Sequence, residues 1–279
     1  MTAGQFLKTG TAKLRRAGIG SARLDVLILL EDALHKDRAW LLANPDAPLQ
    51  GATLKRLERK IERRARHVPL AYIRGHSEFY GRSFKVNRFV LEPRPESETM
   101  IDLLKQIYGN RKSEIGNRVA NCELRIADVG TGNGAIGITA ALEVPDSTVD
   151  LYDISAGALA VAKHNTHLHE LHLHARKMNL LSRPLRPYDV ILANLPYVPD
   201  RWHINEEALA EPKIAIFGGP DGLDVYRKLF HQLARFTWQP KYILTESLPP
   251  QHTALQKIAE LHGFKLKTAQ DFIQVFSPL

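Results

Sequence analysis

The sequence predicts an α/β protein in which a mostly parallel sheet covered by helices follows a small helical bundle. Two observations carry this prediction. From Leu124 onward, short apolar runs rich in β-branched residues alternate with stretches of helical length. Before about residue 75, the apolar residues instead recur at spacings of three and four, which is typical of packed helices.

Residues 1–75 are predicted to form the helical bundle. Leu57 and Ile61 lie on one helical face, with basic residues on the others, and Thr53 is the expected N-cap. Residues 76–92 carry short aromatic and β-branched runs around Gly81, which indicate a hairpin connector. Residues 93–279 then form the α/β domain.

The α/β domain is predicted from alternating strand and helix signals, which favour parallel pairing through helical crossovers. The final segment, 264–277, is expected to form an antiparallel pair at the sheet edge. The strand candidates are 124–129, 148–152, 188–193 and 241–245, and the helix candidates are 97–108, 135–143, 156–167, 222–236 and 250–261.

The composition of the chain excludes several classes of protein. The chain has 279 residues, 44% hydrophobic and 24% charged, which are globular proportions and not those of a disordered chain. It has neither a run of about 18 apolar residues nor a signal-peptide block, so we expect a cytoplasmic protein without membrane spans. Its one cysteine, Cys122, can form neither an internal disulfide nor a thiolate zinc site, and we interpret it as a small buried hydrophobe.

The positive charge lies at one end of the chain. Residues 1–75 contain 15 basic and 7 acidic side chains, whereas residues 76–279 contain 23 of each. A basic end suits docking on RNA or on an acidic partner, although a solvated basic helix face explains it equally well.

A glycine-rich loop is the first candidate site. Asp128-Val129-Gly130-Thr131-Gly132-Asn133-Gly134 follows an apolar strand and opens a helix, where the backbone must turn sharply beside a ligand. The dinucleotide spacing would need glycine at Ala135, and the Lys-Ser/Thr pair of a phosphate loop is missing. The spacing is instead similar to the S-adenosylmethionine loop of methyltransferases. Asp153 ends the second strand candidate, where an acid can bind ribose hydroxyls.

A second candidate site is Asn194-Leu195-Pro196-Tyr197, which follows an apolar strand. The Asn194 side-chain oxygen and the Leu195 carbonyl can each accept a hydrogen bond from a planar NH2 group, which favours charge development on its nitrogen. Tyr197 can stack on that flat group. An ordinary strand-to-loop turn is the alternative interpretation.

These motifs together resemble the protein-glutamine methyltransferases that modify the Gly-Gly-Gln loop of peptide chain release factors. The resemblance covers nearly the full chain. Further matching segments are Pro93 to Glu98, Asp153-Ile154-Ser155, Glu211-Pro212, Gly218 to Leu223 and Tyr226-Arg227.

The resemblance implies a Rossmann-like seven-stranded methyltransferase sheet, a helical substrate-docking domain and a cytoplasmic monomer acting in translation termination. By this resemblance, Asn194 and Tyr197 are catalytic, and Asn194, Leu195, Pro196 and Tyr197 bind the glutamine. The cofactor, S-adenosylmethionine, is assigned to Gly130, Thr131, Gly132, Asn133, Gly134, Asp153, Asn179, Leu180 and Asn194.

The chain departs from the family pattern at three places. Leu195 replaces a proline, which keeps the carbonyl but loosens the loop. Asn179 stands where Asp is usual, and Glu246 is followed by Ser-Leu-Pro-Pro in place of a glycine and polar residues. These departures concern efficiency more than identity.

Several features of the sequence also allow alternative interpretations. Asn-Leu-Pro-Tyr also occurs in methyltransferases of ribosomal RNA adenine, but those place the glycine loop near the N-terminus. A silent RNA-binding adaptor would not need Asp153, Asn194 and Tyr197 together. A histidine cluster at 164–174 suggests a metal, but it has no cysteine and one carboxylate, so we expect none. Arg94 and Glu96 are either a lid or a plain helix entry.

Overall fold

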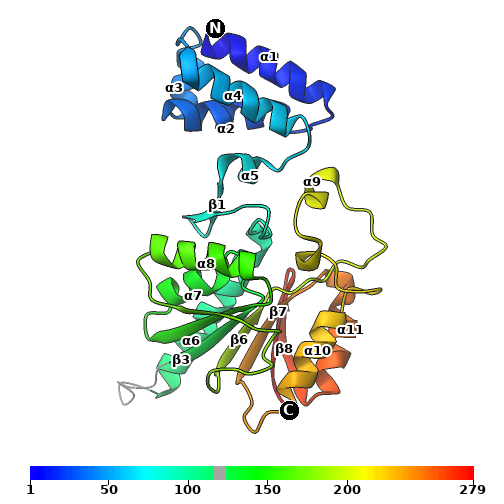
Figure 1. The fold of residues 1–279 in the computed structure, drawn as a ribbon. Helices are drawn as coiled ribbons and strands as arrows, with labels where there is room; N and C mark the ends of the chain where they lie inside the picture. The colour runs from blue at the N-terminus through cyan, green and yellow to red at the C-terminus, as the bar shows by residue number, and fades with distance from the viewer. Residues whose placement is uncertain (116–123) are drawn as a thin grey trace. The chain divides into compact units, whose positions relative to one another are not determined.

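The computed structural model describes residues 1–115 and 124–279, and the chain divides into two units (Figure 1). The first unit contains Met1–His76 together with the short return Ile204–Ala210. The second contains Ser77–His203 and Glu211–Leu279. Cys122 lies outside the described residues.

The first unit is helical, and the buried apolar residues of its helices form one core. Thr2 and Gln5 form a capping box at the start of its first helix. The expected N-cap at Thr53 is wrong, because the basic helix begins one turn earlier, after Gln50. The helices are α1 (Ala3–Arg16), α2 (Ala22–Leu34), α3 (Arg38–Ala43), α4 (Gly51–Arg64), α5 (Leu70–Arg74) and, from the return, α9 (Glu206–Leu209).

The second unit contains a seven-stranded sheet in the order β5-β4-β3-β6-β7-β9-β8, and only the pairs of β9 are antiparallel. The predicted Rossmann-like fold class is therefore confirmed. The strands are β3 (Leu124–Val129), β4 (Ser147–Asp153), β5 (His174–Lys177), β6 (Val190–Ala193), β7 (Tyr242–Glu246), β8 (Phe264–Gln270) and β9 (Ile273–Pro278). A separate hairpin pairs β1 (His76–Phe79) with β2 (Arg82–Lys85).

Helices cover both faces of this sheet, as the strand side chains require. Along β6, Val190 and Leu192 pack into one core, whereas Ile191 and Ala193 pack into the other. Successive side chains of a strand point to opposite faces, so an all-apolar strand needs a cover on each side. The helices are α6 (Glu98–Ile115), α7 (Ala135–Glu143), α8 (Ala156–Leu168), α10 (Asp224–Leu233) and α11 (His252–Glu260) (Figure 1).

The edge strand β5 was not predicted. Its residues, His-Ala-Arg-Lys, show no apolar run, because β5 pairs only with β4 and three of its four residues are exposed. Across the described parts of the chain, 1–115 and 124–279, the structure contains no helix that combines the length and apolarity of a bilayer span.

Candidate functional site

A cavity of about 330 Å³ lies in the second unit, beside the loops that follow β3, β4, β5 and β6. In the sheet, β4 and β5 lie on one side of β3, whereas β6 and β7 lie on the other, so the order of the strands reverses at β3. Ligands of open α/β sheets bind at such a point, outside the carboxyl ends of the strands. Of the residues predicted for the site, those lining the cavity are Gly130, Thr131, Gly132, Asn133, Asp153, Asn179, Leu180, Asn194, Leu195 and Pro196. Gly134 and Tyr197 are not among its lining residues.

The glycine loop turns back on itself at the end of β3. The backbone N–H groups of Gly130 and Thr131 both donate to the Tyr152 carbonyl, at 2.8 and 2.9 Å. Gly130, Gly132 and Gly134 have φ values of 75°, 57° and 85°, in the left-handed region that favours glycine. A Cβ on Gly130 would lie 2.7 Å from the Leu195 Cδ2, so this glycine allows the two candidate loops to touch.

Two aspartates hold the loop. Asp128 is buried, and its Oδ2 accepts hydrogen bonds from the Thr131 hydroxyl at 2.6 Å and the Gly137 N–H at 2.9 Å. Burial raises the pKa of Asp128 to about 6. Asp153 lines the cavity and accepts from the Gly132 N–H at 2.9 Å, and burial raises its pKa as well.

Asn133 carries an unsatisfied polar atom at the cavity. Its Oδ1 accepts from the Ala135 N–H at 3.0 Å, but its buried Nδ2 has no partner among the described residues. A buried donor without a partner costs free energy, so Asn133 is held at the cavity by its other contacts. The buried Asn165 fixes the same segment, since its Nδ2 donates to the Asn133 carbonyl at 2.7 Å.

Two further residues expected to bind the cofactor, Asn179 and Leu180, follow β5. Asn179 and Leu180 both line the cavity, and Leu180 has a φ of 52°. A left-handed backbone is uncommon for leucine and is often found at ligand sites.

Asn194 lies at the end of β6 and is held from behind. Its Nδ2 donates to the Ser97 hydroxyl at 3.0 Å, and that hydroxyl donates to the Glu246 Oε2 at 2.5 Å. The other oxygen of Glu246 accepts from the Tyr197 hydroxyl at 3.1 Å. Burial raises the pKa of Glu246, an effect that hydrogen bonds from Ser97, Tyr197 and Asn194 oppose.

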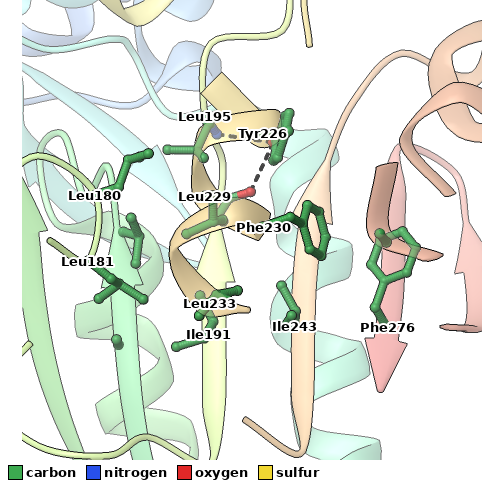
Figure 2. Packing of buried hydrophobic residues seen from close by; sticks show 14 of the residues in the cluster. Leu180, Leu181, Ile191, Leu195, Tyr226, Leu229, Phe230, Leu233, Ile243 and Phe276 are labelled. Atoms are coloured by element: carbon green, nitrogen blue, oxygen red, sulfur yellow. Dashed lines mark hydrogen bonds between the residues drawn. The ribbon is translucent and has the colours of Figure 1, made fainter. Parts of the chain in front are cut away.

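The backbone of Leu195 is held by Tyr226 of α10. The Tyr226 hydroxyl accepts from the Leu195 N–H at 3.2 Å (Figure 2). It also contacts the carbonyls of Ala193 and Glu246. Tyr226 belongs to the buried face of α10, with Leu229, Phe230 and Leu233. The packing of this helix therefore fixes the loop after β6.

The lead-in at 92–94 forms one wall of the cavity. Arg94 bonds to Glu211 at 2.5 Å, and the Glu92 N–H donates to the same carboxylate at 3.0 Å. Glu211 is buried, and burial raises its pKa while Arg94 opposes that shift. Arg94 lines the cavity, as the lid interpretation requires, whereas Glu96 is absent from the lining.

Three residues of this network, Ser97, Glu246 and Tyr226, were not predicted from the sequence to be functional. Each belongs to a segment that matched the family pattern or departed from it, but their connection depends on long-range packing. Only Glu246 carried a local signal, as an acid that ends an apolar strand. In the described part of the chain, no three His, Cys, Asp or Glu side chains are placed to bind a metal ion.

Comparison with known proteins matches the chain to two family models and to several curated relatives. Residues 5–75 match the family model of the PrmC N-terminal domain, and residues 115–211 match that of the methyltransferase small domain. The release factor glutamine methyltransferase of Coxiella burnetii is 34% identical over 87% of this chain and 85% of its own length. That of Koribacter versatilis is 36% identical over 84% of this chain and 81% of its own.

A bifunctional methyltransferase of Rickettsia bellii is 32% identical over 97% of this chain, which spans only 52% of that longer protein. Among solved structures, the catalytic domain of hMettl16 in complex with the MAT2A 3'UTR hairpin 6 superposes with a TM-score of 0.54 at 13% identity. That match covers 78% of this chain and 81% of the other, and it shows a shared fold.

Proposed function

Because this chain belongs to the family of release factor glutamine methyltransferases, we propose that it methylates the side-chain amide of the glutamine in the Gly-Gly-Gln loop of peptide chain release factors. The observation that carries the proposal is one cavity lined by both the glycine loop and Asn194-Leu195-Pro196. The site of action would be the cytoplasm, where translation terminates.

The cofactor of this reaction would be S-adenosylmethionine, whose sulfonium supplies an electrophilic methyl group when bound. The cavity suits a group with ribose hydroxyls and a flat base, because the Asp153 carboxylate, the glycine loop and Leu180 line it. Asp153 would accept hydrogen bonds from the ribose hydroxyls, and Asn133 would line the site. Gly130 to Gly132, with Asn179 and Leu180, would complete the binding site.

The chain's own residues would orient the substrate amide. The Asn194 Oδ1 and the Leu195 carbonyl would each accept a hydrogen bond from one N–H of the amide. These two bonds would direct the nitrogen lone pair toward the methyl group and favour positive charge on the nitrogen. Pro196 lines the same cavity. The Tyr197 ring would stack on the flat amide group of the substrate, while its hydroxyl donates to Glu246.

The helical unit would dock the body of the release factor. Its basic excess suits an acidic partner, and RNA is the less favoured alternative. In this proposal, residues 1–75 dock the substrate, residues 76–92 connect the two parts, and residues 93–279 carry out methyl transfer. The chain would act as a monomer.

Methylation of adenine in ribosomal RNA is the runner-up. It would require an unstacked base in the cavity. The family membership and the long helical region before the glycine loop favour the protein substrate instead.

The test incubates the enzyme and labelled cofactor with three substrates: a purified release factor, its Gln-to-Ala loop variant, and deproteinised ribosomal RNA. Label on the intact factor alone is the expected result. Label on RNA with none on either protein would favour the runner-up, and label on the loop variant would contradict the glutamine assignment.

A further inference from the structure

A chain of buried hydrogen bonds lies behind Asn194 and ends at Glu246. Ser97 is 2% exposed and Glu246 is 1% exposed, so both side chains are shielded from bulk solvent. The chain runs from the Asn194 Nδ2 to the Ser97 hydroxyl at 3.0 Å, and from that hydroxyl to the Glu246 Oε2 at 2.5 Å. It joins three segments that are far apart in sequence.

The donor count in this chain permits only one orientation of the Asn194 amide. A serine hydroxyl has one proton, and here the Glu246 carboxylate accepts it. The Ser97 oxygen can then only accept from Asn194, so the NH2 end of the amide must face Ser97. A flipped amide would place its Oδ1 against an oxygen with no proton left to donate.

The opposite end of the Asn194 side chain is consequently an acceptor. Asn194 lines the cavity, and no donor from the described residues reaches its Oδ1. A primary amide of a substrate offers two N–H donors on its nitrogen, which an oxygen acceptor can bind and an NH2 group cannot.

We propose that Ser97 and Glu246 are positioning residues that select the acceptor orientation of Asn194 and thereby the specificity of the site for an NH2 nitrogen. This inference rests on the proposed function. Glu246 also anchors the second acceptor, because its backbone carbonyl contacts the Tyr226 hydroxyl that binds the Leu195 N–H. The end of β7 therefore holds both Asn194 and Leu195.

The test compares Ser97→Ala and Glu246→Gln with Thr245→Val. Ser97→Ala removes the bridging hydroxyl and leaves only the direct hydrogen bond between Asn194 and Glu246. The nearly isosteric Glu246→Gln allows Ser97 to face either a donor or an acceptor. Thr245 precedes Glu246 on β7, and its buried hydroxyl contacts only the Gln274 carbonyl at 3.4 Å, so Thr245→Val controls for local disturbance.

We expect kcat, at saturating release factor and cofactor, to fall about 10- to 100-fold in Ser97→Ala and Glu246→Gln, because misplaced acceptors lose alignment. Cofactor Kd, measured by calorimetry without release factor, should stay within about twofold, since these residues act on the amide side. Thr245→Val should keep the wild-type kcat. A wild-type kcat in Ser97→Ala and Glu246→Gln would overturn the proposal.

A double-mutant cycle separates positioning from general disruption. In an Asn194→Ala background, Ser97→Ala should cause no further loss of kcat, because the residue it positions is gone. The same fold loss in both backgrounds would overturn the proposal. If Ser97→Ala lowers the Tm, the same double-mutant cycle is measured with Glu246→Gln in place of Ser97→Ala.

A second measurement does not depend on activity. The side-chain NH2 resonances of Asn194, assigned by their loss in Asn194→Ala, should exchange slowly with solvent in the wild type and faster in Ser97→Ala. Equal exchange in both proteins would overturn the positioning role. A wild type that shows this protection but leaves release factors unlabelled would instead refute the proposed function.

Discussion

Gly130 is the residue at which the glycine loop meets the loop after β6. Its φ of 75° is strained for any other residue, and its Cβ position lies 2.7 Å from the Leu195 Cδ2. A side chain there would have to displace Leu195, whose carbonyl is assigned to the amide site and whose N–H is held by Tyr226. One glycine thus constrains cofactor binding and substrate orientation together.

Gly130→Ala is therefore expected to lower the free energy of unfolding and to weaken cofactor binding by more than tenfold. Backbone strain alone costs about 1 to 2 kcal/mol, and the clash with Leu195 adds to it. Gly81→Ala is the matched control, because Gly81 has a φ of 68° but nothing within 4 Å of its Cβ position. Urea unfolding and calorimetry should separate the two variants, and equal effects would contradict the close contact.

Asp128 gives the loop a pH dependence. Its pKa is raised to about 6 from 3.8, so the folded state binds this proton more tightly than the unfolded state does. The Asp128 contribution is therefore most favourable at low pH, and it is lost as the pH rises from about 4 to above 6. From pH 5 to 7.5, the free energy of unfolding should fall by about 1 to 1.5 kcal/mol on account of Asp128.

The measurement is urea unfolding of the wild type and Asp128→Asn at pH 5 and pH 7.5. Asparagine keeps an acceptor oxygen for Thr131 and Gly137 but does not titrate, so the variant should lose this part of the pH dependence. Other buried acids, such as Glu211 and Glu246, contribute equally to both proteins. Identical pH dependence in the two proteins would show that Asp128 does not titrate in this range.

At the scale of elements, α9 depends on one buried arginine of α4. Arg64 is 2% exposed, and it binds Asp25 at 2.6 Å and Glu207 at 2.5 Å. A buried guanidinium needs both carboxylates, because removing a partner leaves an uncompensated charge. The return Ile204–Ala210 is thereby held in the first unit, although its flanking residues belong to the second.

Glu207→Ala is expected to release this return. Backbone amides of Ile204–Ala210 should exchange about five- to tenfold faster, because opening the segment no longer breaks the bond to Arg64. Glu206→Ala is the control, since Glu206 is 70% exposed at its side chain and pairs only with His67. Hydrogen exchange measured by mass spectrometry tests this prediction. Similar exchange rates of Ile204–Ala210 in both variants would show that the bond to Arg64 does not hold this segment.

The elements that sequence predicts well are those with local signals at both ends. Helix α7 begins and ends where it was expected, at Ala135 and Glu143, because a left-handed Gly134 precedes its apolar run. Strand β5 and helix α9 were missed because each is polar and exists through its neighbours. The same holds for the site: the glycine loop and Asn194 are local motifs, whereas the bond from Ser97 to Glu246 spans 149 positions.

At the scale of the whole molecule, charge and chemistry belong to different parts of the chain. The 15 basic and 7 acidic residues of 1–75 contrast with the balanced remainder, while every residue that lines the cavity belongs to the second unit. Long-range charge affects partner encounter and is screened by salt, whereas the aligned acceptors of a site act on the chemical step. A change of surface charge should accordingly alter KM and leave kcat unchanged.

The double variant Arg59→Glu/Arg63→Glu tests this on the exposed face of α4, where the two residues lie one helical turn apart. We expect KM for the release factor to rise about tenfold, with kcat and cofactor Kd unchanged and a weaker dependence of KM on salt. Lys265→Glu/Lys267→Glu makes the same change of charge on exposed positions of β8 and should leave KM near the wild-type value. Equal rises in KM for both variants would mean that only net charge matters, and the helical unit would lose its docking role.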